Sequence, residues 1–357
     1  MLHAVIMAGG SGTRFWPASR RRRPKQLLPI GSETPLLRRT FERLQPWIPP
    51  ERVWVVTTAE LARATAELLP ELPPGNILGE PAGRDTAACA GYAAIRLRAV
   101  DPEATCLVLP ADHVIGAEEL FRAAMEAGAA HVTARGGLLT FGIRPTRPET
   151  GYGYLELGPE AAEIRGHAVH RLRRFVEKPD AETARAYVES GGFLWNSGMF
   201  VWRARDLLGE LARQLPDLFE GLERIAAALG TAGEEEVLHR VYPELRRTSV
   251  DFGVMEGAEL VWCIPVEFPW SDVGSWDAAW EVARKDAGGT AVRGRVVTLD
   301  AEGSLVISDG PAVAVAGVTD LVVVATSDAV LVVPRSQAQR VKEVVRELER
   351  RGWTDLL

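Results

Sequence analysis

The chain has 357 residues, 46% of them hydrophobic, so it holds enough apolar material for one large core or for two domains. Its net charge of −7 and isoelectric point near 5.6 argue against a nucleic acid or an anionic membrane as the main partner, so an anionic substrate would need a local basic pocket. Three cysteines without disulfide or metal-binding spacing, no signal-peptide pattern and no apolar run of about 18 residues predict a cytoplasmic protein.

Apolar strands alternate with helices along the first part of the chain. Strands are expected at Ala4–Met7, Val53–Thr57, Cys106–Leu109 and Leu138–Gly142. Helices are expected at Pro35–Leu44, Glu60–Leu69, Arg84–Val100 and Glu118–Arg135. This alternation predicts an α/β fold, with a Rossmann-like, mostly parallel sheet and helices on both faces. Ligands of such sheets bind beyond the carboxyl ends of the strands.

The pattern of the sequence changes near Asp286–Gly289. Before that point, strands and helices follow one another without an evident linker. Strands are expected at Val169–Glu177 and Phe193–Trp202, and helices at Ala181–Glu189 and Leu207–Leu229. After it, short β-branched runs separated by Gly, Asp and Ser predict a small all-β module, either a β-helix or a sandwich. A helix at Gln337–Arg351 would close this module. We therefore expect two domains, at residues 1–286 and 287–357.

A glycine-rich turn follows the first strand, where residues 8–14 read Ala-Gly-Gly-Ser-Gly-Thr-Arg. Glycine allows positive φ and a close backbone approach to a ligand, with N–H groups that donate to phosphate oxygens; the glycines are Gly9, Gly10 and Gly12. Arg14 and Lys25 would add positive charge beside the same anion. The run has neither a Gly-x-Gly-x-x-Gly nor a Gly-Lys-Ser/Thr pattern, which disfavours a dehydrogenase or a P-loop NTPase. A tight β–α turn is the alternative interpretation.

Two acidic residues and one basic run are further candidates. Asp112 follows a buried strand and Asp272 lies in Trp-Ser-Asp-Val-Gly, although either could cap a helix or turn instead. Mg²⁺ binds one or two carboxylates together with phosphate oxygens, so the pair suits triphosphate chemistry. The run Arg20–Arg23 is either a solvated loop or a mobile lid that meets phosphates.

Residues 80–86, Glu-Pro-Ala-Gly-Arg-Asp-Thr, precede an expected helix. They could form no more than a capped helix start, where the first N–H groups need partners. Alternatively they recognise a base, because a carboxylate can accept from guanine N1–H and N2–H₂ together. Glu80 suits that role, and Arg84 and Thr86 suit contacts with O6 or phosphate.

The glycine turn and the segment after it resemble the signature of the sugar-nucleotide pyrophosphorylases, Gly-x-Gly-Thr-Arg followed after a gap by Pro-Lys. The longer match, including Trp-Pro-Ala-Ser-Arg at 16–20 and Pro-Lys-Gln at 24–26, is similar to the mannose-1-phosphate guanylyltransferases. The resemblance implies a nucleotidyltransferase type A fold, with the catalytic domain at 1–286. It also implies transfer of GMP from GTP to mannose 1-phosphate, giving GDP-mannose and pyrophosphate, with Mg²⁺ as cofactor.

The resemblance also implies roles for individual residues. The catalytic residues would be Arg14, Lys25, Asp112 and Asp272, of which Asp112 and Asp272 would ligate the metal. The nucleotide site would comprise Ala8, Gly9, Gly10, Gly12, Thr13, Arg14, Lys25, Glu80, Arg84, Thr86 and Asp112. Three motifs, at 149–154, 175–179 and 195–200, match the sugar-phosphate site, which would comprise Gly151, Tyr152, Glu177, Lys178, Asn196, Gly198 and Asp272.

Some positions and conclusions stay open. Asp85 stands where the family has Asn, which weakens any contact that needs an amide donor. Asp251 and Glu256, in Ser-Val-Asp-Phe-Gly-Val-Met-Glu, brace the site or serve as solvated or capping groups. Two other functions remain: a pyrophosphorylase that uses glucose 1-phosphate with dTTP or UTP, and a non-catalytic regulatory subunit that binds GDP-mannose. A homodimer through the β-rich tail is a further possibility.

Overall fold

The computed structural model describes residues 1–10 and 12–357; Ser11 of the glycine turn lies outside the described residues. The chain forms two compact units. The sheet unit comprises residues 1–9, 41–110 and 115–269, and the β-helix unit comprises residues 10–40, 111–114 and 270–357. Each unit is therefore built from several separate stretches of sequence. The glycine turn is divided between them, because Gly9 belongs to the first and Gly10 to the second.

A nine-stranded sheet forms the centre of the sheet unit, in the order β3-β2-β1-β4-β9-β6-β10-β8-β7. The strands are β1 (Leu2–Met7), β2 (Val53–Thr58), β3 (Ile77–Glu80), β4 (Thr105–Pro110), β6 (Leu138–Ile143), β7 (Gly153–Ile164), β8 (His167–Glu177), β9 (Phe193–Arg203) and β10 (Val261–Val266). All except β8 and β9 run in the same direction. The expected mostly parallel sheet is confirmed, and its central strands are apolar runs buried on both faces.

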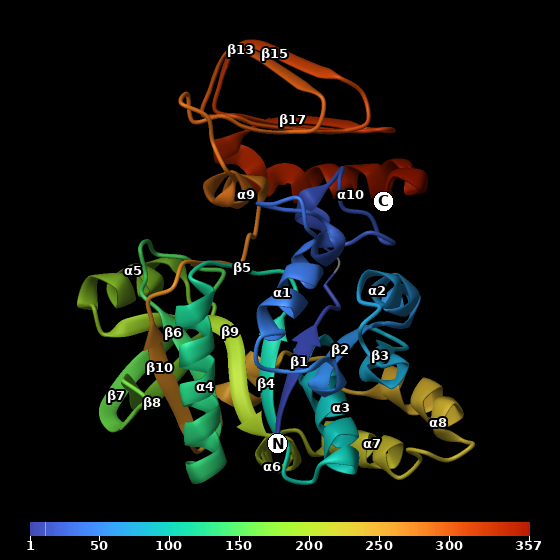
Figure 1. Ribbon diagram of the computed structural model, residues 1–357, viewed down its shortest axis with the longest axis vertical. Coiled ribbons are helices and arrows are strands. Elements are labelled where there is room, and N and C mark those ends of the chain that lie inside the picture. The colour runs from blue at the N-terminus through green and yellow to red at the C-terminus, as the bar shows by residue number, and fades with distance from the viewer. Residues whose placement is uncertain (11) are drawn as a thin grey trace. The chain divides into compact units, whose positions relative to one another are not determined.

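Helices cover both faces of this sheet (Figure 1). The helices of the chain are α1 (Leu36–Leu44), α2 (Ala62–Leu68), α3 (Asp85–Val100), α4 (Glu118–Arg135), α5 (Ala181–Ser190), α6 (Ala204–Gln214), α7 (Pro216–Ala226), α8 (Glu234–Val241), α9 (Trp276–Val282) and α10 (Val341–Arg351). The Ala-rich α3 packs with α6 and α7 against Cys106 and Val108 of β4. On the opposite face, Gly128 of α4 lies against Leu139 and Phe141 of β6. No helix in the described part of the chain is long and apolar enough to cross a membrane.

One prediction from the sequence is wrong, because a segment expected to form a single helix forms two. The expected helix Leu207–Leu229 is two helices, α6 and α7, which meet at Leu215. Leu215 has φ −134° and ψ 58°, which is not helical, and Pro216 begins α7. Proline lacks the N–H that would continue the first helix, but it suits the first position of the second.

The carboxyl-terminal part of the β-helix unit winds as successive coils. Four strands, β12 (Ala291–Arg293), β14 (Leu305–Asp309), β16 (Leu321–Thr326) and β17 (Val330–Pro334), form one sheet, while β13 (Val296–Glu302) pairs in parallel with β15 (Val313–Thr319). Because β12, β14 and β16 are also parallel neighbours, the chain returns to the same sheet once per coil. This arrangement is that of a β-helix rather than a sandwich. Its core includes Trp276 of α9 and Val341 of α10.

Candidate active site

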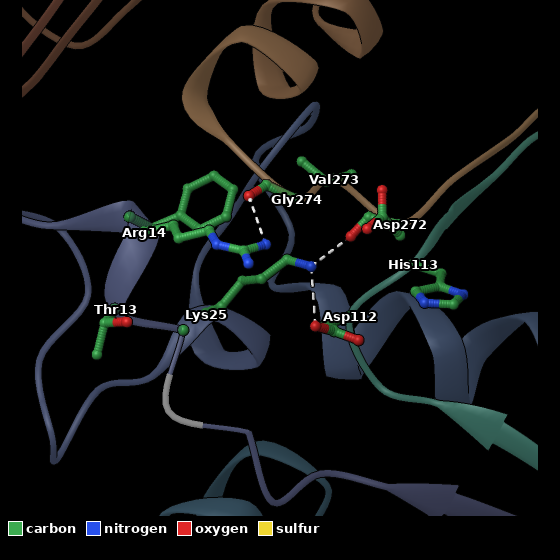
Figure 2. A pocket seen from close by; sticks show the side chains of 10 residues that line it. Thr13, Arg14, Lys25, Asp112, His113, Asp272, Val273 and Gly274 are labelled. Carbon is green, nitrogen blue, oxygen red and sulfur yellow. Dashed lines mark hydrogen bonds and ion pairs between the residues drawn. The ribbon is translucent and has the colours of Figure 1, made fainter. Parts of the chain in front are cut away.

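A cavity of about 330 Å³ lies within the β-helix unit (Figure 2). It is lined by Gly12, Thr13, Arg14, Phe15, Lys25, Asp112, His113, Asp272, Val273 and Gly274. Three separate segments of the chain supply these residues: the glycine turn with its following segment, the residues after β4, and the residues before α9. The structure thus brings predicted binding residues that lie far apart in sequence into one concave site.

Lys25 is buried at the centre of this cavity. Its ammonium donates to Asp112 Oδ2 at 2.8 Å and to the backbone carbonyl of Asp272 at 2.5 Å (Figure 2). The ammonium also lies 5.7 Å from the centre of the Phe15 ring. A buried ammonium is costly unless it is paired and hydrogen-bonded, so these contacts keep a positive charge at a fixed point of the cavity.

The carboxylate of Asp112 is held in its charged form. Burial raises the pKa of Asp112, but the adjacent positive charge of Lys25 and the hydrogen bond that Lys25 donates help to outweigh burial, and the pKa lies below its usual value. The ring of His113 is itself oriented, because Trp270 Nε1–H donates to His113 Nδ1 at 3.2 Å. The site therefore presents an ionised carboxylate beside a buried ammonium.

Gly12 is required by both its conformation and its close packing. Its φ is +60°, and a Cβ at this position would lie 2.4 Å from Lys25 Cβ. The next residues start a short 3₁₀ turn that exposes Thr13 and Arg14 to the cavity, and Arg14 donates to the carbonyl of Gly274 at 3.5 Å. Glycine is the residue that tolerates both constraints, so the turn fixes the stem of Lys25 and the direction of Arg14.

Asp272 lies in a strained segment. Val273, its neighbour, has φ +44° although it is β-branched and buried, a conformation that persists only where the surroundings impose it. Ser275 caps α9 with its hydroxyl, so Asp272 does not have the capping role that the sequence left open. Within the described chain, no helix begins at Asp112 either. Both acidic residues instead line the cavity.

The two acidic residues fit a magnesium ion in chemical type. Mg²⁺ typically takes one or two carboxylates and completes its shell with water and substrate phosphates. Across residues 1–10 and 12–357, no group of three or more His, Cys, Asp or Glu side chains is gathered for a metal. Asp112 and Asp272 would therefore hold the ion together with the phosphates of a substrate.

The basic run Arg20–Arg23 is tied to the β-helix at both ends. Arg20 pairs with Asp328 at 2.9 Å and Arg23 with Asp309 at 3.0 Å, while Arg21 is exposed. Both acidic partners belong to the ends of β-helix strands or the turns after them. These two ion pairs fix the ends of the run in this structure.

In the sheet unit, Glu80 ends β3 and is buried. Its pKa is raised to about 7: burial and, less strongly, the negative charge of Asp85 raise it, while the hydroxyl of Tyr242 lowers it by donating to Glu80 Oε1. Thr86 is engaged in packing, because its hydroxyl accepts from the N–H of Val250 at 2.9 Å. The side chain of Arg84 is half-buried, and its Nε has no hydrogen-bond partner in the described structure.

Two sugar-site candidates, Glu177 and Lys178, lie in the sheet unit at the end of β8, whereas Asp272 lies in the β-helix unit. Glu177 Oε1 pairs with the ammonium of Lys178 at 2.8 Å, and Glu177 Oε2 is buried without a partner among the described residues. Burial lowers the pKa of Lys178, but the ion pair and the charges of Asp251 and Asp85 outweigh burial and raise it. Glu256 accepts from the backbone N–H of Glu177 at 2.8 Å, so it braces this strand end.

Asn196 has a fixed hydrogen-bonding direction. Its Oδ1 accepts from Thr140 at 2.8 Å and from the N–H of Gly198 at 3.2 Å, and its Nδ2 donates to Asp251 at 2.8 Å. Because a backbone N–H can only donate, the oxygen must face Gly198. Asn196 therefore has one N–H left to donate to a ligand. Its Oδ1 already accepts two hydrogen bonds and is not available as an acceptor for a ligand.

The remaining candidates are placed as follows. Gly151 is exposed and donates to Glu149, and Tyr152 packs edge to face on Trp195 with ring centres 5.2 Å apart. Gly9 and Gly10 are exposed, whereas Ala8 is buried and both its backbone groups bond to β2. Tyr242 and Thr140 could not be identified from the sequence, because each lies far along the chain from the residue to which it donates a hydrogen bond. Tyr242 donates to Glu80, and Thr140 donates to Asn196.

Two family models match this chain. The model of a family described as nucleotidyl transferase matches residues 3–289, and that of a MannoseP isomerase/GMP-like β-helix domain matches residues 294–348. The chain therefore belongs to the nucleotidyl transferase family.

Similar proteins narrow this class to the group that the motifs indicated. A mannose-1-phosphate guanylyltransferase of Escherichia coli is 39% identical, over 99% of this chain and 75% of the relative. The alginate biosynthesis protein AlgA of Pseudomonas aeruginosa is 37% identical, over 98% of this chain and 73% of the relative. A crystal structure from Thermus thermophilus, named mannose-1-phosphate geranyltransferase, aligns with a TM-score of 0.85 at 39% identity and covers 98% of this chain and 99% of its own. The resemblance to the mannose-1-phosphate guanylyltransferases is confirmed.

Proposed function

We propose that the protein transfers GMP from GTP to mannose 1-phosphate, forming GDP-mannose and pyrophosphate. The observation that carries this proposal is the cavity in which a buried, hydrogen-bonded Lys25 ammonium lies beside the ionised Asp112. Such a site suits a substrate with a high density of negative charge that must also bind a divalent cation. The family and its relatives supply the nucleotide and sugar classes.

The chemistry follows from the charges. An oxygen of the sugar phosphate attacks the α-phosphorus of GTP in line, and the bond from that phosphorus to the bridging oxygen breaks, releasing pyrophosphate. The sugar phosphate is already ionised near pH 7, so no general base is needed. Lys25 would meet the α-phosphate and Arg14 the departing pyrophosphate, so catalysis would consist of positioning and electrostatic stabilisation.

Mg²⁺, held by Asp112 and Asp272, would neutralise phosphate charge and so reduce the repulsion between the two substrates. Lys25 would contribute the same kind of stabilisation from a permanent position. Before substrate binds, its ammonium pairs with the half-buried Asp112 and keeps that carboxylate hydrogen-bonded.

The sheet unit would supply selectivity. Glu80 would accept from guanine, and Glu177, Lys178 and Asn196 would contact the sugar phosphate. We assign catalysis to residues 1–286, and keep a homodimer through the β-rich residues 287–357 as part of the proposal. The three cysteines are free and buried, which suits the reducing cytoplasm expected for such metabolism.

A grid of GTP, dTTP, UTP and ATP against mannose 1-phosphate and glucose 1-phosphate tests the proposal, with pyrophosphate release as the measurement. The highest kcat/KM is expected for GTP with mannose 1-phosphate. A higher value for glucose 1-phosphate with dTTP or UTP would replace this assignment with the other pyrophosphorylase specificity. Absence of pyrophosphate release with every pair, together with binding of GDP-mannose, would indicate a regulatory subunit.

A further inference from the structure

Glu80 and Tyr242 form a buried polar pair inside the sheet unit. Tyr242 is fully buried in the 3₁₀ turn Tyr242–Glu244 after α8, and its hydroxyl donates to Glu80 Oε1. Its ring packs edge to face on Tyr92 of α3, with ring centres 5.6 Å apart. The sequence positions differ by 162, so this contact depends on the packing of the helices beside β3.

The second oxygen of Glu80 faces Gly9, which belongs to the same unit. A Cβ on Gly9 would lie 3.2 Å from Glu80 Oε2, and Gly9 itself is exposed. The two oxygens of one carboxylate therefore have different surroundings: Oε1 is held in the interior, and Oε2 points toward an exposed segment. Glu80 is 5% exposed, so a ligand that reached Oε2 would meet an oriented acceptor.

The charge of Glu80 depends on its hydrogen bond to Tyr242. The pKa of this carboxyl group is raised to about 7, because burial and the negative charge of Asp85 raise it more than the hydrogen bond from Tyr242 lowers it. The other titratable groups facing it are Cys89 and Tyr92 of α3, which are buried and have raised pKa values of their own. Near neutral pH, the donor from Tyr242 thus increases the fraction of Glu80 that is ionised.

We propose that Tyr242 is a positioning residue that sets the base preference of this protein, by keeping Glu80 an acceptor whose Oε2 is directed at a purine N–H. The inference rests on the proposed function. Guanine presents N1–H and N2–H₂ donors, hypoxanthine presents only N1–H, and adenine presents an acceptor at N1. An ionised Oε2 has lone pairs for both guanine donors but meets only one donor on hypoxanthine, whereas protonation of the carboxyl group adds an O–H donor that opposes the purine donors.

Tyr242→Phe tests this inference, because it removes one hydroxyl and keeps the ring. Tyr92→Phe is the matched control, since Tyr92 is a buried neighbour that packs on Tyr242 and contributes no hydrogen bond to the pKa of Glu80 among the described residues. The ratio of kcat/KM for GTP to that for ITP is measured from about pH 6 to about pH 9, because kcat/KM reports the ionisations of the free enzyme. Binding of GDP and IDP by calorimetry provides a readout independent of catalysis.

In the wild type, kcat/KM for GTP should rise as pH increases through about 7, since ionised Glu80 is the accepting form. In Tyr242→Phe the rise should shift upward by about one pH unit or more, and the GTP/ITP ratio at pH 7 should fall about tenfold, the size expected for losing one hydrogen bond to a charged group. The KM for mannose 1-phosphate should not change. Tyr92→Phe should behave as the wild type does.

An unchanged pH profile and an unchanged GTP/ITP ratio in Tyr242→Phe would overturn the inference, as would equal losses for every nucleotide at every pH. If that variant does not fold, Glu80→Gln serves instead: it cannot ionise, so the pH-dependent step must disappear. Failure of the proposed function is a separate result, because the wild type would then release no pyrophosphate while its GDP/IDP preference could still be measured.

Discussion

Replacing Lys25 with alanine tests the electrostatic basis of the site. The change removes the donor to Asp112 Oδ2 and to the carbonyl of Asp272, which are 2.8 and 2.5 Å from the ammonium. Asp112 then loses the cation and the hydrogen bond that lower its pKa, so the pKa of Asp112 should rise. The variant therefore loses a fixed positive charge and also weakens the ionised state of a proposed metal ligand.

The expected size of the effect comes from the preorganisation of this ammonium. Lys25 is held by two hydrogen bonds before any substrate binds, so no reorganisation is needed during the reaction. Loss of one such contact costs about 10²-fold or more in kcat, or about 2.7 kcal/mol of transition-state stabilisation. The folding free energy should change much less, because the side chain of Asp112 is 36% exposed and solvent screens the ion pair.

The measurement is pyrophosphate release at saturating GTP, mannose 1-phosphate and Mg²⁺, with thermal unfolding as the test of folding. Lys342→Ala, on an exposed position of α10, is the matched control and should retain wild-type turnover. Lys25→Arg should lose activity to a smaller extent, because it keeps the charge but replaces a compact ammonium with a planar group. A folded Lys25→Ala protein with wild-type kcat would refute the role of this charge.

Three further predictions concern the turn, the sugar site and the metal. Gly12→Ala places a Cβ 2.4 Å from Lys25 Cβ, so kcat should fall about tenfold or more, whereas Gly352→Ala, which has φ +73° in open space, should leave kcat unchanged. Burial raises the pKa of Asp251 to about 7, and the ionised carboxylate accepts from Asn196 of the sugar site. The KM for mannose 1-phosphate should therefore fall as pH rises through about 7. Asp251→Asn should remove that dependence and leave the KM for GTP unchanged. Chelation by EDTA should abolish pyrophosphate release and added Mg²⁺ should restore it; release that continues in EDTA would contradict the proposed metal dependence.

Local patterns predicted several elements closely. The helix expected at Glu118–Arg135 is α4 with the same bounds, since its apolar spacing is clear and Gly136 ends it with φ +70°. The runs after Trp280 are strands of the β-helix, as their β-branched composition indicated. The sequence did not predict the strand β7, because its burial alternates irregularly, although its partner β8 follows it directly in the chain.

The sequence by itself determined the chemical types present: a glycine turn that can lie close to another segment, a lysine and two aspartates suited to phosphates and a metal, and a carboxylate suited to guanine. Only the tertiary structure decided which of these groups meet and in which state. Lys25 reaches Asp112 across 87 positions and Asp272 across 247, and Glu80 meets Tyr242 across 162. Sequence periodicity reports neighbours within a few residues, whereas charge state and hydrogen-bond direction depend on burial and on partners that folding brings from elsewhere in the chain.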